Sequence, residues 1–105
     1  MVARGEVWWA ESPVAGRRPY LVLSRDAAIP WLRQLLTAPL TRTVRGIPTE
    51  VPLDVDDGVS EPCAAWLDNV ELMPKAYLVE RMCTVGPQQM AAVCAALAIA
   101  VDCQR

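Results

Sequence analysis

With 105 residues, the chain is expected to fold as one small domain over residues 1–105. Its composition, 53% hydrophobic and 21% charged, is that of a packed globule and excludes a disordered chain. No apolar run reaches the roughly 18 residues that span a bilayer, and the absence of histidine excludes the commonest acid–base residue and metal ligand. The net charge of −2 hides a basic half: residues 1–45 carry seven arginines and three acidic residues, which indicates a local anion site.

The first third of the chain predicts two strands joined by a basic loop. Residues 5–10 read as an aromatic strand, residues 12–18 as a loop that carries Arg17 and Arg18, and residues 19–24 as a buried strand that Pro19 begins. A helical turn is expected over residues 26–29, ended by Pro30.

Further strands are predicted across the middle of the chain. Residues 35–41 form one, in which Pro39 indicates a sheet edge or a bulge. The alternation over residues 49–54 predicts a half-exposed strand, and residues 63–68 an apolar one beyond a turn at 56–58. Residues 69–84 are ambiguous except for a short strand at 79–84.

The C-terminal segment predicts a helix capped by Gly86, with Pro87 first and an apolar run over 90–101. One face at helical spacing consists of Met90, Val93, Cys94, Leu97 and Val101. The opposite face is barely polar, which favours contact with a second subunit over core packing alone. The order of elements predicts an α+β, mainly β fold: a small, strongly bent antiparallel sheet or partly open barrel with a C-terminal α-helix.

The cysteines and tryptophans are expected to serve mainly in the core. The four cysteines fit no zinc-binding spacing, and we expect reduced, mostly buried thiols and no metal. Trp8 and Trp66 lie inside predicted strands and are expected in the core, whereas Trp9 and Trp31 are expected to meet a ligand or a partner.

Three segments together resemble the MazF/PemK family of toxin endoribonucleases. They are an opening R-G-[DE]-[IV]-[WY] strand, a G-x-R-P-x-L-V-[IL]-S segment and a strand ending in P-[LI]-T, present here as residues 4–9, 16–24 and 38–41. Weaker similarities follow at 47–53 and 65–70, so the resemblance covers nearly the whole chain in the family's order.

The resemblance implies a CcdB/PemK-type fold, akin to an SH3-like barrel, assembled as a homodimer. It also implies the toxin of a type II toxin–antitoxin system: a metal-independent, sequence-selective endoribonuclease that cleaves single-stranded RNA (mRNA, or tRNA and rRNA loops) and inhibits translation. The expected partners are RNA and a MazE-like cognate antitoxin in the RNA groove, with no cofactor and no membrane. Because the N-terminus lacks the apolar core of a signal peptide, we expect a cytoplasmic protein.

RNA is cut without metal when its 2′-hydroxyl attacks the adjacent phosphate, leaving 2′,3′-cyclic phosphate and 5′-hydroxyl ends. Arg18 matches the family's catalytic arginine, and its planar guanidinium suits the charge that develops on the phosphate. Thr41 matches the family's catalytic threonine. Arg17, Ser24 and Asn69 are candidates for substrate contact, and Arg42 and Arg45 for holding the RNA backbone.

The first loop departs from the family pattern, because it lacks the acidic residue of an S-E-Q-type stretch that takes part in catalysis. Glu11 or Ser12 could substitute as the base from the end of the first strand. Two rival functions therefore stay open: a CcdB-like gyrase poison, although its C-terminal Trp-Gly-Ile is missing, and a non-catalytic RNA-binding module of the same fold.

Overall fold

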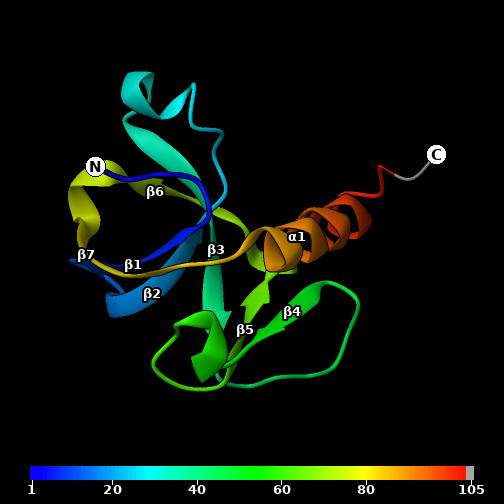
Figure 1. Cartoon of the computed structure of the whole chain (residues 1–105). Coiled ribbons are helices and arrows are strands. Elements are labelled where there is room, and N and C mark those ends of the chain that lie inside the picture. The colour runs from blue at the N-terminus through cyan, green and yellow to red at the C-terminus, as the bar shows by residue number, and fades with distance from the viewer. Residues whose placement is uncertain (104–105) are drawn as a thin grey trace.

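A computed structural model describes residues 1–103. Its strands are β1 (Glu6–Ser12), β2 (Gly16–Val22), β3 (Gln34–Thr41), β4 (Glu50–Leu53), β5 (Cys63–Trp66), β6 (Glu71–Pro74) and β7 (Leu78–Thr84), followed by the helix α1 (Pro87–Ala100). Short 3₁₀ turns cover Ile29–Trp31, Val55–Asp57, Leu67–Asn69 and Lys75–Tyr77. This confirms the predicted mainly β fold with one C-terminal helix (Figure 1).

The sheet is antiparallel throughout and is organised around β3. The strand order is β4-β5-β3-β2-β1-β7, and β6 also pairs with β3. Along one edge of β3, the pairs with β6 end at Thr37 and those with β5 begin at Leu40. Pro39 lies where the neighbouring strand along this edge changes from β6 to β5. The sheet tolerates a proline there, because no partner on that side needs the backbone N–H that proline lacks. Because β3 is central, the first of the two alternatives predicted for Pro39, a sheet edge, is wrong; Pro39 lies instead at a local break in the pairing of β3.

The first hairpin is tighter than predicted. Residues 12–18 were expected as a loop, but β1 and β2 extend until only residues 13–15 connect them. The turn closes because Gly16 has φ +75° and the Ser12 hydroxyl accepts the Ala15 N–H at 2.8 Å. Arg17 and Arg18 consequently belong to a strand, where they pair with Glu11 and Ala10.

Two local expectations change in the rest of the sheet. Pro30 was expected to end a helical turn, but it lies inside the Ile29–Trp31 turn. The first turn of a helix accepts proline, because the backbone N–H groups there make no hydrogen bond within the helix. The ambiguous segment contains β6 as well as β7, and β6 depends on pairing with β3, for example Leu36 with Leu72.

The helix begins at Pro87 with Gly86 as its N-cap, as predicted. Its buried residues are Val93 and Ala96, and Met90, Leu97 and Ala100 pack against the same core. Cys94, predicted on the buried face, is exposed and accepts a hydrogen bond from Arg4 at 3.1 Å. Because α1 packs on β4 and the Leu67–Asn69 turn, the core side of the helix is rotated from the predicted stripe.

The apolar residues form two clusters. One joins α1 to the strands through residues such as Leu53, Leu67 and Val93, and the other contains Tyr20, Leu35 and Met73. Trp8 is half-buried against the second cluster, whereas Trp31 is 87% exposed. Of the four free cysteines only Cys63 is buried, so the expectation of mostly buried thiols is wrong. Within residues 1–103, no helix is both long and apolar enough to cross a membrane.

Candidate active site

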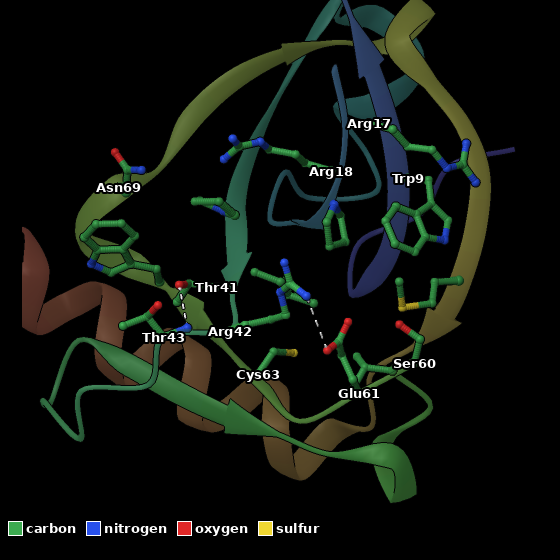
Figure 2. Close-up of a pocket in the computed structure, with 16 residues that line it drawn as sticks. Trp9, Arg17, Arg18, Thr41, Arg42, Thr43, Ser60, Glu61, Cys63 and Asn69 are labelled. Atoms are coloured by element: carbon green, nitrogen blue, oxygen red, sulfur yellow. Dashed lines mark hydrogen bonds and ion pairs between the residues drawn. The ribbon is translucent and has the colours of Figure 1, made fainter. Parts of the chain in front are cut away.

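A cavity of about 580 Å³ opens between the β1–β2 hairpin, the end of β3 and β5. Its lining combines cations, hydroxyls and indole rings: Trp9, Arg17, Arg18, Pro19, Pro39, Leu40, Thr41, Arg42, Thr43, Val59, Ser60, Glu61, Cys63, Trp66, Asn69 and Met82 (Figure 2). The cavity therefore brings together five residues that were predicted for the site. Arg17 and Arg18 lie on β2, Thr41 ends β3 and is followed by Arg42, and Asn69 ends the Leu67–Asn69 turn.

The two adjacent arginines of β2 lie in different environments. Arg17 donates to Glu11 at 2.7 Å and to Glu80 at 2.6 Å, and its guanidinium lies 4.9 Å from the centre of the Trp9 ring. The hydrogen bonds to Glu80 and Glu11 raise the pKa of Arg17. The Arg18 side chain makes no hydrogen bond or ion pair with any other residue between 1 and 103. Figure 2 shows its guanidinium directed toward the side of the cavity where Asn69 lies, away from Arg17.

The end of β3 supplies a hydroxyl and a cation. The Thr41 hydroxyl accepts the Thr43 N–H at 3.1 Å, and because a hydroxyl has two lone pairs and one hydrogen, its hydrogen stays available to a ligand. Arg42 faces Glu61 across the cavity, with 3.8 Å between Nη1 and the carboxylate. Both side chains are more than half exposed, so this pair holds neither group tightly.

Trp66 and Asn69 close the side opposite the hairpin. Trp66 was predicted in the core, but it is half-buried and lines the cavity. Asn69 ends the Leu67–Asn69 turn, which is fixed by the Thr49 hydroxyl donating to Asp68 at 2.5 Å. Asn69 lies on the side of the cavity toward which Arg18 is directed (Figure 2), and Trp66 lines the same cavity.

Four predicted residues do not line the cavity. The Ser24 hydroxyl accepts the Leu36 N–H at 2.8 Å and so is used between strands β2 and β3. The Ser12 hydroxyl closes the hairpin turn, and Glu11 binds Arg17. The Arg45 guanidinium lies 4.5 Å from the centre of the Trp66 ring, behind the cavity wall. Each of these four side chains is therefore engaged by a structural contact and does not itself line the cavity.

Sequence reasoning missed Thr43, Ser60, Glu61 and Cys63, which also line the cavity. Residues 60–63 reach it because β5 pairs with the end of β3, a long-range contact with no local sequence signal. Burial, with help from Glu61, raises the pKa of the Cys63 thiol to about 11, so this thiol is protonated at neutral pH.

The charges of the cavity favour an anionic ligand. Among the described residues, three guanidinium groups and one carboxylate line it, and the Arg18 guanidinium is the one that makes neither a hydrogen bond nor an ion pair. Guanidinium groups bind phosphate through paired N–H donors, and indole faces stack on bases. The arrangement is suited to a phosphate-bearing chain with exposed bases.

Comparison with known proteins gives a consistent result over the whole chain. Residues 3–101 match the family model described as PemK-like, MazF-like toxin of type II toxin–antitoxin system. The "Probable endoribonuclease MazF5" of Mycobacterium tuberculosis (strain ATCC 25618 / H37Rv) is 51% identical over 104 residues, 98% of this chain and 95% of the relative. The solved structure of Mycobacterium tuberculosis toxin MazF-mt6 matches with a TM-score of 0.84 and 32% identity, covering 92% of this chain and 96% of that one. An endoribonuclease in complex with its cognate antitoxin, from a mycobacterial species, matches with a TM-score of 0.86 and 28% identity, covering 97% and 96%.

Proposed function

The chain belongs to the PemK-like, MazF-like toxin family of type II toxin–antitoxin systems, and on that premise we propose that it is a cytoplasmic endoribonuclease that cuts single-stranded RNA without a metal ion. The proposal is supported by relatives that are named endoribonucleases and by a basic cavity with indole walls. Its metal independence is what the family resemblance implies, and the absence of histidine and of zinc-ligand spacing in the sequence agrees with it.

The observation that carries the proposal is the unpaired Arg18 in the same cavity as the Thr41 hydroxyl. In the proposed reaction the RNA 2′-oxygen attacks the adjacent phosphorus, and the bond from phosphorus to the 5′-oxygen breaks. The products are a 2′,3′-cyclic phosphate and a 5′-hydroxyl. Arg18 donates two N–H groups to the phosphate oxygens as negative charge develops, and Thr41 donates its hydroxyl hydrogen to a phosphate or leaving-group oxygen.

The 2′-hydroxyl proton needs an acceptor, and we assign this role to Glu61. Among the described residues that line the cavity, Glu61 is the one carboxylate, whereas guanidinium groups do not accept protons and the Cys63 thiol is protonated. The leaving 5′-oxygen takes its proton from solvent while the Thr41 hydroxyl donates a hydrogen bond to it. Glu61 then returns the proton it accepted to solvent, so the proton count balances.

We further propose that the chain acts as a homodimer and is neutralised by a cognate antitoxin. One of its solved relatives is bound to such an antitoxin. An extended acidic segment of the antitoxin would occupy the cavity, because the three arginines that attract RNA phosphates also attract carboxylates. RNA and antitoxin would then compete for Arg18.

The test is incubation of the purified chain with a long RNA and with total tRNA in EDTA, followed by analysis of the new ends. We expect discrete cuts with 5′-hydroxyl ends, and a strong reduction of these cuts in Arg18→Ala. Cleavage that needs an added metal ion, or that leaves 5′-phosphate ends, contradicts the proposed chemistry. Absence of cleavage on both substrates favours a non-catalytic RNA-binding module, or a gyrase poison if growth inhibition persists in Arg18→Ala.

A further inference from the structure

The connection between β3 and β4, residues 42–49, is tied at its centre to a buried carboxylate. The Glu50 side chain is 1% exposed. Its Oε1 accepts the Arg45 backbone N–H at 2.8 Å, and its Oε2 accepts Arg45 Nη1 at 2.9 Å. A buried charge needs such partners, because water no longer solvates it. Glu50 therefore fixes both the backbone and the guanidinium of Arg45.

The same guanidinium continues toward the cavity. Arg45 Nη1 also donates to the Thr43 carbonyl oxygen at 3.3 Å, and the Thr43 N–H donates to the Thr41 hydroxyl at 3.1 Å. Nη1 carries two hydrogens, and both are used by these two acceptors. A continuous series of contacts thus joins the buried Glu50 to the hydroxyl proposed to act on the RNA.

Arg45 also holds one wall of the cavity. Its guanidinium lies 4.5 Å from the centre of the Trp66 ring, and Trp66 lies directly opposite Glu50 in the β4–β5 ladder. The Trp66 indole N–H is buried and has no hydrogen-bond partner among the described residues. The stacked guanidinium is therefore the polar contact that orients this ring.

We propose that Glu50 and Arg45 are positioning residues for RNA cleavage: they hold the residue 42–49 connection so that the Thr41 hydroxyl and the Trp66 face keep their places in the cavity. This inference rests on the proposed function. It is an alternative to the prediction from sequence that Arg45 holds the RNA backbone, and it is favoured because Arg45 Nη1 is bound to Glu50 and Thr43. Neither residue lines the cavity.

A positioning role and a phosphate-binding role of Arg45 predict different results for Arg45→Lys and Arg45→Met. If Arg45 positions the connection, both variants lose activity; if it binds a phosphate, Arg45→Lys retains most activity and Arg45→Met does not. A lysine keeps the charge but loses the planar group that stacks on Trp66 and reaches two acceptors at once. The variants are compared with the unaltered chain, Glu50→Gln and Arg33→Lys, which changes an exposed arginine that does not line the cavity. Turnover is measured on an RNA that carries the mapped cleavage sequence, and Kd on its analogue with a 2′-deoxy residue at the cut, over a range of salt concentrations.

We expect Arg45→Lys, Arg45→Met and Glu50→Gln to lower kcat by about 10²-fold, the effect of a displacement of roughly 1 Å in a catalytic group. The Kd of the uncleavable RNA and its salt slope should stay as in the unaltered chain. If Arg45 instead contacts a phosphate, Arg45→Met weakens binding and lowers the salt slope by about one, while Arg45→Lys retains most activity. That result overturns the proposal.

Hydrogen exchange of residues 42–49 provides a readout that needs no cleavage. We expect faster exchange of the Thr43 and Arg45 amides in Arg45→Lys, with the exchange of β1 and β2 unchanged. Unchanged exchange at Thr43 overturns the proposal even if kcat falls. If the unaltered chain and Arg33→Lys cut no RNA, the proposed function fails, and the exchange experiment still decides whether Arg45 holds this connection. Glu50→Gln is interpreted only with Arg45→Lys, since removal of a buried charge also lowers stability.

Discussion

Arg17 and Glu11 lie directly opposite each other in the β1–β2 ladder, and Arg17 Nη1 donates to the Glu11 carboxylate at 2.7 Å. Nη2 of the same guanidinium donates to the carboxylate of Glu80 on β7 at 2.6 Å. This leaves Arg18 as the cation of the pair with free donors in the cavity. Neighbouring arginines of one strand are thus divided between holding the sheet and facing the ligand.

The first prediction is that Arg18→Ala lowers kcat on RNA by about 10²–10³-fold, the usual cost of losing one donor to a developing oxyanion. Arg17→Ala should lower kcat by less than about tenfold, because its guanidinium is engaged by two carboxylates and is less available to phosphate. Single-turnover cleavage of the same RNA by both variants measures the difference. Equal losses would show that both arginines act on the phosphate.

Replacement of Thr41 tests the hydroxyl. Thr41→Val keeps the shape of the side chain but removes the hydrogen that the Thr43 contact leaves free, and we expect a fall in kcat of about 10²-fold. Thr41→Ser restores the hydroxyl and should recover most of the rate. The uncleavable 2′-deoxy RNA serves as the binding control. A Thr41→Val enzyme with full kcat would remove the hydroxyl from the mechanism.

Glu61 is tested against a matched acidic residue outside the cavity. Glu61→Gln keeps the size of the side chain but cannot accept a proton, and loss of a general base costs about 10²–10⁴-fold in rate. Asp56→Asn makes the same charge change at an exposed position that does not line the cavity, and its rate should match the unaltered chain. Full activity in Glu61→Gln would assign the proton acceptor elsewhere.

The elements with strong local signals were predictable from the sequence, and those that depend on distant contacts were not. The aromatic and apolar strands of the first half and the helix with Pro87 at its start follow from local pattern. Strand β6 has four residues and exists through its pairing with β3, so residues 69–84 alone stayed ambiguous. Cys94 fits the helical period, but the surface that α1 covers decides which side is buried.

The same division holds for the candidate site. Arg18 and Thr41 were assigned to the site because their segments resemble motifs of a known family. The pairing of β2 with β3 brings both residues to one cavity. Glu61 and Trp66 reach it through the pairing of β5 with β3, which no local motif encodes. Ser24 was assigned from its segment, but its hydroxyl is used by the Leu36 N–H.

The cysteines differ in predicted reactivity because the thiolate is the nucleophile. Burial raises the pKa of Cys63 from 9.0 to about 11, which lowers its thiolate fraction about 100-fold at a pH near 8, while Cys103 is exposed. Timed labelling with iodoacetamide, read by mass spectrometry, should modify Cys103 first and Cys63 last. The difference should vanish in denaturant. Equal rates in the folded chain would contradict the burial of Cys63.

Glu6 should make stability depend on pH. Its side chain is 7% exposed and its carboxylate accepts hydrogen bonds from the Ala3 N–H, the Trp8 indole and Arg81 at 2.8, 2.9 and 3.0 Å. Burial by itself raises the pKa of Glu6, but these hydrogen bonds outweigh it, so the pKa lies below the ordinary 4.5. The unfolded chain then binds the proton more tightly, and the stabilisation is present above the unfolded pKa and lost as the pH falls through the folded one.

We therefore expect Glu6→Gln to lower the free energy of unfolding at about pH 7 by about 1–3 kcal/mol, the cost of leaving charge-assisted hydrogen bonds unmade. The gap to the unaltered chain should shrink as the pH falls below the ordinary 4.5, because the native carboxylate then takes up its proton. Urea unfolding followed by tryptophan fluorescence measures both values, and Glu71→Gln, at an exposed position, provides the control for charge alone. A gap that stays constant or widens in acid would mean that the Glu6 carboxylate does not stabilise the fold through its charge.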